Sequence, residues 1–333
     1  MSFKIVRLRS QEGHESAANH FAETVLEGLS RKEKCLPSWL IFDDRGSEIF
    51  KELTELESYH ASVCEKEILL SHKEVISAIV APGPFRLIDL GSGEGSKTRI
   101  LIDQFLKNNL QFEYIPIDLS AGAVTDLVAG LREKYSATSL TVKGAVADYF
   151  QGLEEFAGSG GKRNFALFQG ATIGNRDLAE VKTWLRRLAD ALNPGDYVMV
   201  AFDLMKPPKL LYRSYNDPQG IFEKFNLHVL DRINRQLGAD FNIANYVQEA
   251  IYNWRTRSVE SYIYSVKDQR VRVKALDREF FFKQGEGMRT EQSYKFTIEE
   301  IDGLAEESGF AVMERLFDAR KYCVSPIWQV KPR

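Results

Sequence analysis

A strand, a glycine-rich turn and a helix follow one another at residues 87–102, and this arrangement constrains the fold more than any other part of the chain. The apolar run Leu87-Ile88-Asp89-Leu90 leads into Gly91-Ser92-Gly93-Glu94-Gly95, and helix-forming sequence starts near Thr98. Glycine permits the tight turn and the close approach of a ligand to the backbone N–H groups. Open α/β sheets bind ligands at the carboxyl ends of parallel strands. The segment therefore predicts a ligand site at the end of such a strand.

Two phosphate-binding patterns do not fit this turn. A dinucleotide fingerprint needs G-x-G-x-x-G, and a P-loop needs a four-residue spacer between its glycines. Here the glycines alternate, and the carboxylate of Glu94 would repel a phosphate. The pattern D-x-G-x-G is typical of S-adenosylmethionine-dependent methyltransferases, whose ligand carries a cationic sulfonium. A structural turn in an unrelated α/β domain is the alternative.

The next two predicted strands also end in acidic residues. The strand at 112–119 ends in Asp118, and the strand at 140–149 ends in Asp148-Tyr149. A carboxylate at the first position can accept both ribose hydroxyls of a nucleoside. At the second position, Asp148 suits the adenine amino group and the ring of Tyr149 suits stacking. The three strand ends together favour a nucleoside ligand.

Composition and charge exclude several classes of partner. The chain has 333 residues and a formal charge of −3, so nucleic acid and anionic membranes are not expected partners. No apolar run reaches membrane-spanning length, and the mixed polarity of residues 1–30 predicts no signal peptide. The wide spacing of Cys35, Cys64 and Cys323 predicts free thiols in a cytoplasmic protein, with no disulfide framework and no metal site.

Helices and strands alternate between about residues 65 and 202. After a helix at 65–79, the pattern predicts strands at 85–91, 112–119, 140–149, 164–170 and 196–203, with helices at 97–108, 121–135 and 178–192 between them. Such alternation is typical of a doubly wound parallel sheet. A short helix is also expected at 21–29.

The alternation stops at about residue 205. Residues 205–295 contain Pro207-Pro208, a predicted helix at 244–256 and an alternating stretch at 259–273. This stretch is too long for a loop and predicts a second subdomain. The pattern resumes with a helix at 297–309 and two apolar stretches, 311–317 and 322–330, that are expected to pair antiparallel.

Several segments outside the glycine turn resemble the histidine-specific Nα-methyltransferase family, whose best-known member makes hercynine (histidine betaine) in ergothioneine biosynthesis. The resemblance covers essentially the whole chain. Its marks are residues 42–50 (FDDRGSEIF), 53–59 (LTELESY), 170–175 (GATIGN), 225–226 with 234–235, and 288–296 (MRTEQSYKF). It implies a seven-stranded, Rossmann-like class I methyltransferase sheet with an intergrown α+β subdomain. The implied S-adenosylmethionine-binding domain is 65–204 plus 296–333, and the implied substrate-binding subdomain is 1–64 plus 205–295.

The resemblance also implies roles for individual residues. The cofactor contacts that it implies are Phe42, Gly91, Gly93, Lys97, Asp118, Asp148 and Tyr149, where Phe42 replaces a tyrosine that is frequent in the family. The α-amino and α-carboxylate groups of the substrate would be held by Gly170, Asn175 and Tyr215. Tyr59, Glu291 and Ser293 would line the pocket for the substrate side chain.

The pair Glu291 and Ser293 matches the chemistry of an imidazole. Residues two apart lie on the same face of an extended strand. A neutral imidazole offers one donor and one acceptor nitrogen, so Glu291 can accept from one and Ser293 can serve the other. A tryptophan side chain offers one N–H and no acceptor. The family pattern changes at His60, which follows Tyr59 where an aromatic pair is common, and at small Ser261. A wider pocket at these positions would admit a modified histidine or another aromatic amino acid.

The expected reaction is methylation of the α-amino group of L-histidine, three times in sequence, by a monomeric enzyme. The sulfonium methyl is already activated, so catalysis needs mainly the correct placement of a neutral amine. No strong base stands in the motifs, and the proton is expected to pass to water. The alternatives are an Nα-methyltransferase for tryptophan or a derivative, a cofactor-binding protein without catalysis, and a dehydrogenase, which the glycine spacing disfavours.

Overall fold

The computed structural model describes residues 2–8, 14–158 and 161–332, and the chain divides into two compact units. Unit 1 consists of Met1–Ser10, Ala61–Met205 and Phe296–Arg333, and unit 2 consists of Gln11–His60 and Lys206–Lys295. Each unit is therefore built from segments that are distant in the sequence. The two units are described separately below.

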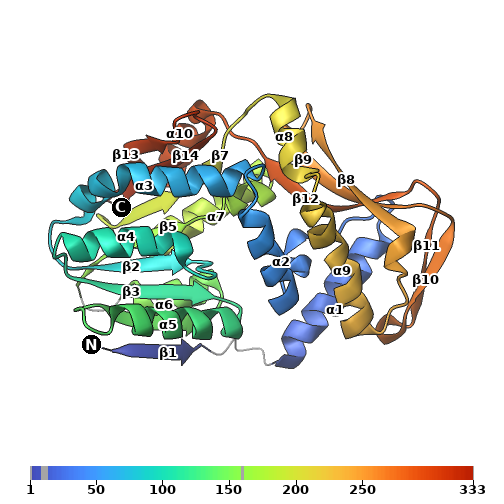
Figure 1. The fold of residues 1–333 in the computed structure, drawn as a ribbon, viewed down its shortest axis with the longest axis horizontal. Coiled ribbons are helices and arrows are strands. Elements are labelled where there is room, and N and C mark those ends of the chain that lie inside the picture. Colours follow the sequence, from blue (N-terminus) through green and yellow to red (C-terminus); the bar gives the residue numbers. More distant parts are fainter. Residues whose placement is uncertain (1, 9–13, 159–160, 333) are drawn as a thin grey trace. The chain divides into compact units, whose positions relative to one another are not determined.

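Unit 1 is built on one mixed sheet, which is nine-stranded within the described residues and runs in the order β1-β4-β3-β2-β5-β6-β14-β13, with β7 also paired to β14 (Figure 1). The first six strands in this order are parallel to one another, and β14 runs antiparallel to both of its neighbours, β6 and β13. The strands are β1 (Phe3–Arg7), β2 (Phe85–Leu90), β3 (Phe112–Asp118), β4 (Thr141–Val146), β5 (Arg163–Phe168), β6 (Tyr197–Val200), β7 (Phe202–Asp203), β13 (Phe310–Phe317) and β14 (Cys323–Val330).

Helices cover both faces of this sheet (Figure 1). Apolar side chains of α3, α4 and α5 form one core with β2, β3 and β4, and Trp184 of α7 packs on Phe150 of α6 and Phe168 of β5. The helices are α3 (His60–Val80), α4 (Ser96–Lys107), α5 (Ala121–Tyr135), α6 (Tyr149–Phe156), α7 (Leu178–Ala191) and α10 (Ile298–Glu307). β2 is buried along its whole length, as expected for a parallel strand between two helical layers. The predicted doubly wound α/β class is confirmed.

Strand order decides where this unit can bind a ligand. β2 pairs with β3 on one side and with β5 on the other. The chain therefore adds β3 and β4 on one side of β2, and then adds β5 and β6 on the other side. Open α/β sheets bind ligands at this reversal point, outside the carboxyl ends of the strands. The turn Gly91–Gly95 follows directly on β2 and therefore lies at that point.

Three sequence predictions for unit 1 are wrong in detail. The sheet contains more than seven strands, because β1 joins its edge by pairing with β4, although residues 1–64 were assigned to the substrate subdomain. The predicted strand 140–149 ends at Val146, and Tyr149 begins α6. The predicted strand 196–203 is interrupted at Ala201, and its two parts, β6 and β7, both pair with β14.

Unit 2 contains a three-stranded antiparallel sheet, in the order β12-β9-β8, and a β10–β11 hairpin. Its strands are β8 (Tyr246–Asn253), β9 (Ser258–Ser265), β10 (Gln269–Val273), β11 (Arg278–Phe282) and β12 (Gly287–Tyr294), and its helices are α1 (His14–Ser30), α2 (Asp44–Thr54), α8 (Pro208–Tyr215) and α9 (Ile221–Leu237). The predicted helix at 244–256 is wrong, because residues 246–253 form β8 and pair with β9 along their full length. Pairing with β9 gives hydrogen-bond partners to the backbone N–H and C=O groups of this segment, which in a helix would bond to one another.

Three of the family marks build the scaffold of unit 2. Asp43 caps the start of α2 by accepting from the Gly46 amide (2.8 Å), and it also bonds His228 Nε2 (2.7 Å) and Arg235 Nη2 (2.8 Å) of α9. Asn226 of α9 accepts a 2.6 Å hydrogen bond from the hydroxyl of Thr290 in β12. These marks therefore hold α2, α9 and β12 together.

Candidate functional site

The glycine turn after β2 has the backbone conformation that only glycine adopts readily. Gly91 and Gly93 have φ values of +77° and +49°. A Cβ atom on Gly91 would lie 3.1 Å from the hydroxyl of Tyr149, whereas one on Gly93 would meet nothing within 4 Å. The turn thus brings Gly91 close to Tyr149 and leaves open space beside Gly93.

Asp89, the acid that precedes the turn, has a structural role. It is buried, and its carboxylate accepts hydrogen bonds from the hydroxyls of Thr98 (2.6 Å) and Tyr114 (2.8 Å). Burial raises the pKa of this carboxyl, and the two hydroxyls oppose the rise. Asp89 therefore ties β2 to α4 and β3 beneath the turn.

Asp118, at the end of β3, lies beside the glycine turn. Its Oδ2 accepts from the amide of Gly93 (3.0 Å), and its Oδ1 accepts from the amide of Ser120 (2.9 Å). The carboxylate is thereby fixed against the turn, where sequence reasoning expected a group that binds ribose hydroxyls. The structure brings Gly93 and Asp118 together; the ribose contact stays a prediction.

Asp148 and Tyr149 lie at the start of α6. Oδ1 of Asp148 accepts from the amides of Phe150 (2.9 Å) and Gln151 (3.1 Å), so this side chain caps the helix. The ring of Tyr149 packs edge-on against Phe168, with 5.6 Å between ring centroids. Burial raises the pKa of the Tyr149 hydroxyl to about 12. Both residues belong to unit 1 with the glycine turn, and their adenine contacts stay predictions.

Sequence reasoning missed the residue that organises this region, Glu65 of α3. Its carboxylate pairs with the ammonium of Lys97 in α4 and accepts from the amides of Gly170 (2.5 Å) and Ala171 (3.2 Å). Only 2% of Glu65 is exposed. One signal was available, because Glu65 interrupts the apolar stripe of α3 formed by Ala61, Ile68 and Leu69.

The segment 170–175 forms a strained turn followed by the short 3₁₀ helix Thr172–Asn175. Gly170 has a φ of +85°, and Ala171 has a φ of +52° although it carries a side chain. A positive φ at a residue other than glycine costs energy, and such strain gathers at functional sites. Glu65 holds both amides and so stabilises this conformation. Asn175 ends the 3₁₀ helix.

Two polar atoms in the same unit fit a bound ligand. Ser92 Oγ, in the glycine turn, and Gln169 Nε2, just after β5, are buried and have no hydrogen-bond partner among the described residues. Buried polar atoms without partners are costly and call for an explanation. A ligand seated at the ends of β2 and β5 would supply the partners. The residues present therefore fit the nucleoside that the sequence predicted.

Unit 2 holds the second group of predicted residues, around a buried lysine. Lys295 is fully buried, and its Nζ donates to the hydroxyls of Tyr215 (2.8 Å) and Ser293 (2.7 Å). The ammonium also lies 4.8 Å from the centroid of the Tyr215 ring, which packs against Tyr59 at 6.3 Å. Sequence reasoning did not predict Lys295. Its only sequence signal is a lysine between two aromatic residues.

Because Lys295 can only donate, it fixes the direction of these hydrogen bonds. Each hydroxyl has one proton and two acceptor lone pairs. Ser293 and Tyr215 accept from the lysine, so each keeps its own proton for donation to another group. The two hydroxyls are thus prepared to act as hydrogen-bond donors.

Glu291, on the same strand as Ser293, supplies an acceptor. The residue is partly exposed, but its Oε2 is shielded from solvent and has no hydrogen-bond partner among the described residues. Burial raises the pKa of this carboxyl to about 7, and the charge of Lys295 opposes the rise. The ladder register between β12 and β9 shifts between Arg289 and Glu291, and bulges of this kind often redirect side chains at sites.

Three other residues named from the sequence also belong to unit 2. Phe42 is 37% exposed, and its ring packs on the rings of Phe50 and Phe225. Its contact with the cofactor stays a prediction. Ser261 pairs with Glu291 across the β9–β12 ladder and accepts a 2.8 Å hydrogen bond from Gln248. The small Ser261 is thereby joined to a polar side chain that sequence reasoning did not single out. His60 begins α3.

No helix in the described ranges is long and apolar enough to cross a membrane.

Replacing Glu291 by glutamine is expected to change how stability depends on pH. In the unfolded chain the carboxyl ionises near pH 4.5, whereas in the folded protein its pKa is about 7. Folding therefore favours the neutral acid, whose contribution is present below pH 4.5 and is lost as pH rises through 7. The loss is at most about 3 kcal/mol, from 1.36 kcal/mol per pKa unit, and partial exposure reduces it.

Thermal unfolding at pH 5 and pH 8, without ligands, measures this effect. The melting temperature of Glu291→Gln relative to the unmodified protein should be higher at pH 8 than at pH 5. An equal difference at both pH values would contradict the raised pKa. Glu249→Gln, which changes an exposed carboxylate on β8, is the control and should show no such dependence.

Comparisons with known proteins identify the family of this chain. A sequence profile described as "Histidine-specific methyltransferase, SAM-dependent" matches residues 21–330. The chain is 34% identical over 295 residues to the histidine N-alpha-methyltransferase of Mycolicibacterium smegmatis, covering 89% of this chain and 90% of that protein. It is 35% identical over 291 residues to the enzyme of the same name from Mycobacterium tuberculosis, covering 84% of this chain and 88% of that one.

A longer fungal protein is also similar. Ergothioneine biosynthesis protein 1 of Schizosaccharomyces pombe is 27% identical over 299 residues, which are 88% of this chain but only 38% of the fungal protein. The profile match spans most of both units, including the glycine turn, the Gly170–Asn175 segment and the segment from Glu291 to Lys295. The chain therefore belongs to the family of histidine-specific, S-adenosylmethionine-dependent methyltransferases.

Proposed function

We propose that this enzyme transfers methyl groups from S-adenosylmethionine to the α-amino group of L-histidine, three in succession, and that the product is hercynine. The observation that carries the substrate assignment is the polarity of the Glu291–Ser293–Lys295 group. Glu291 presents an acceptor atom that has no partner in the part of the chain that the structure describes, and Lys295 leaves the hydroxyl of Ser293 as a donor. A neutral imidazole carries one donor and one acceptor and can satisfy both.

Other aromatic side chains fit this polarity less well. An indole has one N–H and no acceptor, so it would leave the Ser293 hydroxyl unpaired. A phenyl ring would leave both groups unpaired. Sites built from buried polar groups discriminate strongly against ligands that leave those groups without partners. Tryptophan and its derivatives are therefore the second candidates, behind histidine.

The residues of unit 1 are proposed to hold the cofactor. S-adenosylmethionine supplies a methyl group already activated by the sulfonium. The turn at Gly91 and Gly93 offers backbone amides and open space, and Asp118 is held beside it as an acceptor for ribose hydroxyls. Asp148 and Tyr149 are proposed for the adenine, and Lys97 and Phe42 complete the proposed contacts.

The amine and carboxylate of the amino acid are proposed to be positioned by Gly170, Asn175 and Tyr215. Because Lys295 donates to it, the hydroxyl of Tyr215 acts as a donor toward other groups, which is the role that a substrate carboxylate requires. Correct placement of a neutral amine supplies most of what this reaction needs. The proton released from the ammonium is proposed to pass to water. Tyr59, whose ring packs on Tyr215, completes the proposed pocket for the side chain.

The cellular setting is proposed on chemical grounds and on relatives. None of the three cysteines forms a disulfide, which suits a reducing compartment such as the cytoplasm. We propose that the enzyme acts there as a monomer. The name of the similar protein from Schizosaccharomyces pombe supports a place in ergothioneine biosynthesis.

Calorimetric titration with a small panel of amino acids tests the proposed substrate. With S-adenosylhomocysteine present, histidine and Nα-dimethylhistidine should bind, and tryptophan should bind at least about tenfold more weakly. Glu291→Gln should weaken histidine binding by about 10- to 100-fold, because a hydrogen bond to a charged group contributes about 1.5–3 kcal/mol. Glu249→Gln should leave it unchanged. Tight binding of tryptophan but not histidine would overturn the histidine assignment and leave the methyltransferase assignment standing.

Replacing Lys295 by methionine should impair use of the amino acid but not cofactor binding. Methionine fills a similar volume, so the unit should still fold, which circular dichroism checks. Without the ammonium, the hydroxyls of Tyr215 and Ser293 lose their fixed orientation, and we expect kcat/KM for histidine to fall by about 10- to 100-fold. The affinity for S-adenosylhomocysteine should not change.

A double-mutant cycle shows whether Lys295 acts through Ser293. The combined loss in Lys295→Met with Ser293→Ala should be smaller than the product of the two single losses, since the residues share one hydrogen bond. Independent effects would exclude this role. Lys283→Met, at an exposed site of the same unit, is the control.

Asp118→Ala tests the cofactor site. We expect the Kd for S-adenosylhomocysteine to rise by about 10- to 100-fold, because two ribose hydroxyls and the Gly93 amide lose a charged acceptor. Titration calorimetry measures it. Asp126→Ala, which removes an exposed carboxylate of α5, is the control. An unchanged affinity in Asp118→Ala would show that the ribose lies elsewhere.

A further inference from the structure

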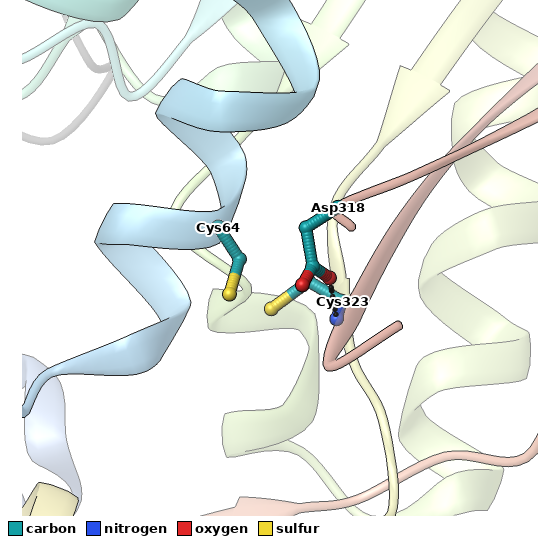
Figure 2. A group of neighbouring side chains, drawn as sticks. All are labelled: Cys64, Asp318 and Cys323. Atoms are coloured by element: carbon teal, nitrogen blue, oxygen red, sulfur yellow. Dashed lines mark hydrogen bonds between the residues drawn. The ribbon is translucent and has the colours of Figure 1, made fainter. Parts of the chain in front are cut away.

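Two cysteines and an aspartate that are far apart in the sequence meet inside unit 1. They are Cys64 in the first turns of α3, Asp318 just after β13, and Cys323 at the start of β14 (Figure 2). All three are buried, and their two sulfur atoms and a carboxylate oxygen lie within 4.8 Å of one another. Figure 2 shows the sulfur of Cys64 directed toward the other two residues. Neither the cofactor contacts nor the substrate contacts proposed above use any of them.

The spacing of these atoms suits a tetrahedral zinc ion. Zn–S bonds of about 2.3 Å and Zn–O bonds of about 2.0 Å place tetrahedral ligand atoms roughly 3.3 to 3.8 Å apart. Because every pair of these atoms lies within 4.8 Å, the present separations exceed those values by at most about 1.5 Å, which side-chain rotation can close. Thiolate sulfur together with carboxylate oxygen is a ligand set that zinc accepts.

Asp318 is held in the way that ligating carboxylates are held. Its Oδ1 accepts from the amides of Tyr322 (2.8 Å) and Cys323 (2.7 Å), and its Oδ2 accepts from the amide of Arg320 (3.0 Å). A carboxylate oxygen has two lone pairs, so the bond to Arg320 leaves one on Oδ2 for a cation. Outer-shell hydrogen bonds of this kind fix the orientation of metal ligands.

The surroundings offer a fourth ligand and a route of entry. The sulfur of Cys323 lies 3.6 Å from Oδ1 of Asp203, a second buried carboxylate. Nη2 of Arg320 lies 3.7 Å from the sulfur of Cys64, and the Arg320 side chain belongs to an exposed residue. Movement of Arg320 would uncover the site, and its positive charge would offset part of the negative charge of two thiolates and two carboxylates.

We propose that Cys64, Asp318 and Cys323 form a zinc site, with Asp203 or a water molecule as the fourth ligand. Binding replaces two S–H bonds by two Zn–S bonds and releases two protons, and no atom changes its oxidation state. The ion joins the start of α3 to the β13–β14 turn. Cys64 directly precedes Glu65, so the ion would also fix the helix segment that holds Lys97 and the Gly170 turn. Its role is structural.

Titration of the full-length, reduced protein with Co²⁺, after treatment with a chelator and its removal, tests the site. Tetrahedral cobalt bound by thiolates gives sulfur-to-cobalt charge-transfer absorption and strong visible bands. We expect these bands to saturate at one Co²⁺ per chain and to disappear on addition of Zn²⁺. Added Zn²⁺ should also raise the temperature of unfolding, because it binds the folded state.

Variants separate the proposed site from other thiols. Cys64→Ser and Cys323→Ser should each abolish the charge-transfer bands and weaken zinc binding by more than about 100-fold. Cys35→Ser, which removes the third cysteine and lies in unit 2, should keep both. If a serine variant fails to fold, Asp318→Asn, which keeps the shape of the side chain, decides through a loss of zinc affinity.

Two results would overturn the proposal. One is the absence of cobalt–thiolate bands in the reduced protein, or bands that persist in Cys323→Ser. The other is an intact mass lower by two hydrogens, with Cys64 and Cys323 both unreactive toward a thiol reagent in air and zinc unable to prevent it. That result would identify the pair as a disulfide. Neither result bears on the amino-acid substrate, which the calorimetric panel tests separately.

Discussion

The hydrogen bonds of one buried carboxylate, Glu65, join the elements on which unit 1 depends. Glu65 accepts from the amides of Gly170 and Ala171 and pairs with Lys97. It thereby connects three elements. They are α3, to which it belongs, α4, which follows the glycine turn, and the strained segment after β5. Burying a carboxylate costs free energy unless the carboxylate is paired and hydrogen-bonded. The same holds for its partners here, because a backbone amide or an ammonium removed from water also needs a hydrogen-bond partner. The conformation of the Gly170 turn and the position of Lys97 are therefore set by the same side chain.

Lys295 has a comparable place in unit 2. A buried ammonium needs acceptors, and the hydroxyls of Tyr215 and Ser293 provide them. The same bonds decide which way the two hydroxyl protons point. Glu291, whose pKa burial raises to about 7, completes a group with one acceptor and defined donors. The specificity proposed for the enzyme thus depends on a residue that need not touch the substrate side chain.

The local sequence predicted most of unit 1 and less of unit 2. Period and turn signals predicted the strands and helices between residues 85 and 192 because buried parallel strands and amphipathic helices leave strong patterns. They failed at 244–256, where β8 forms because β9 lies alongside it, and at Tyr149, where the cap made by Asp148 starts a helix. The site residues came mainly from motif resemblance. Glu65, Gln248 and Lys295 were missed because a single polar residue in an apolar setting reveals its role only through its partners.

The sequence by itself determined the class of the fold, the position of the glycine turn and the membership of the family, because these depend on local patterns and on motifs of adjacent residues. Tertiary structure alone decided which distant residues meet. It brought Glu65 to Gly170, Lys295 to Tyr215, and Cys64 to Cys323, although the wide spacing of the cysteines had predicted no metal site. Contacts of this kind follow from strand order and helix packing, which no local pattern encodes. The electrostatics of a site depend on those contacts, so the pKa of Glu291 and the orientation of the two hydroxyl groups also become visible only in the folded protein.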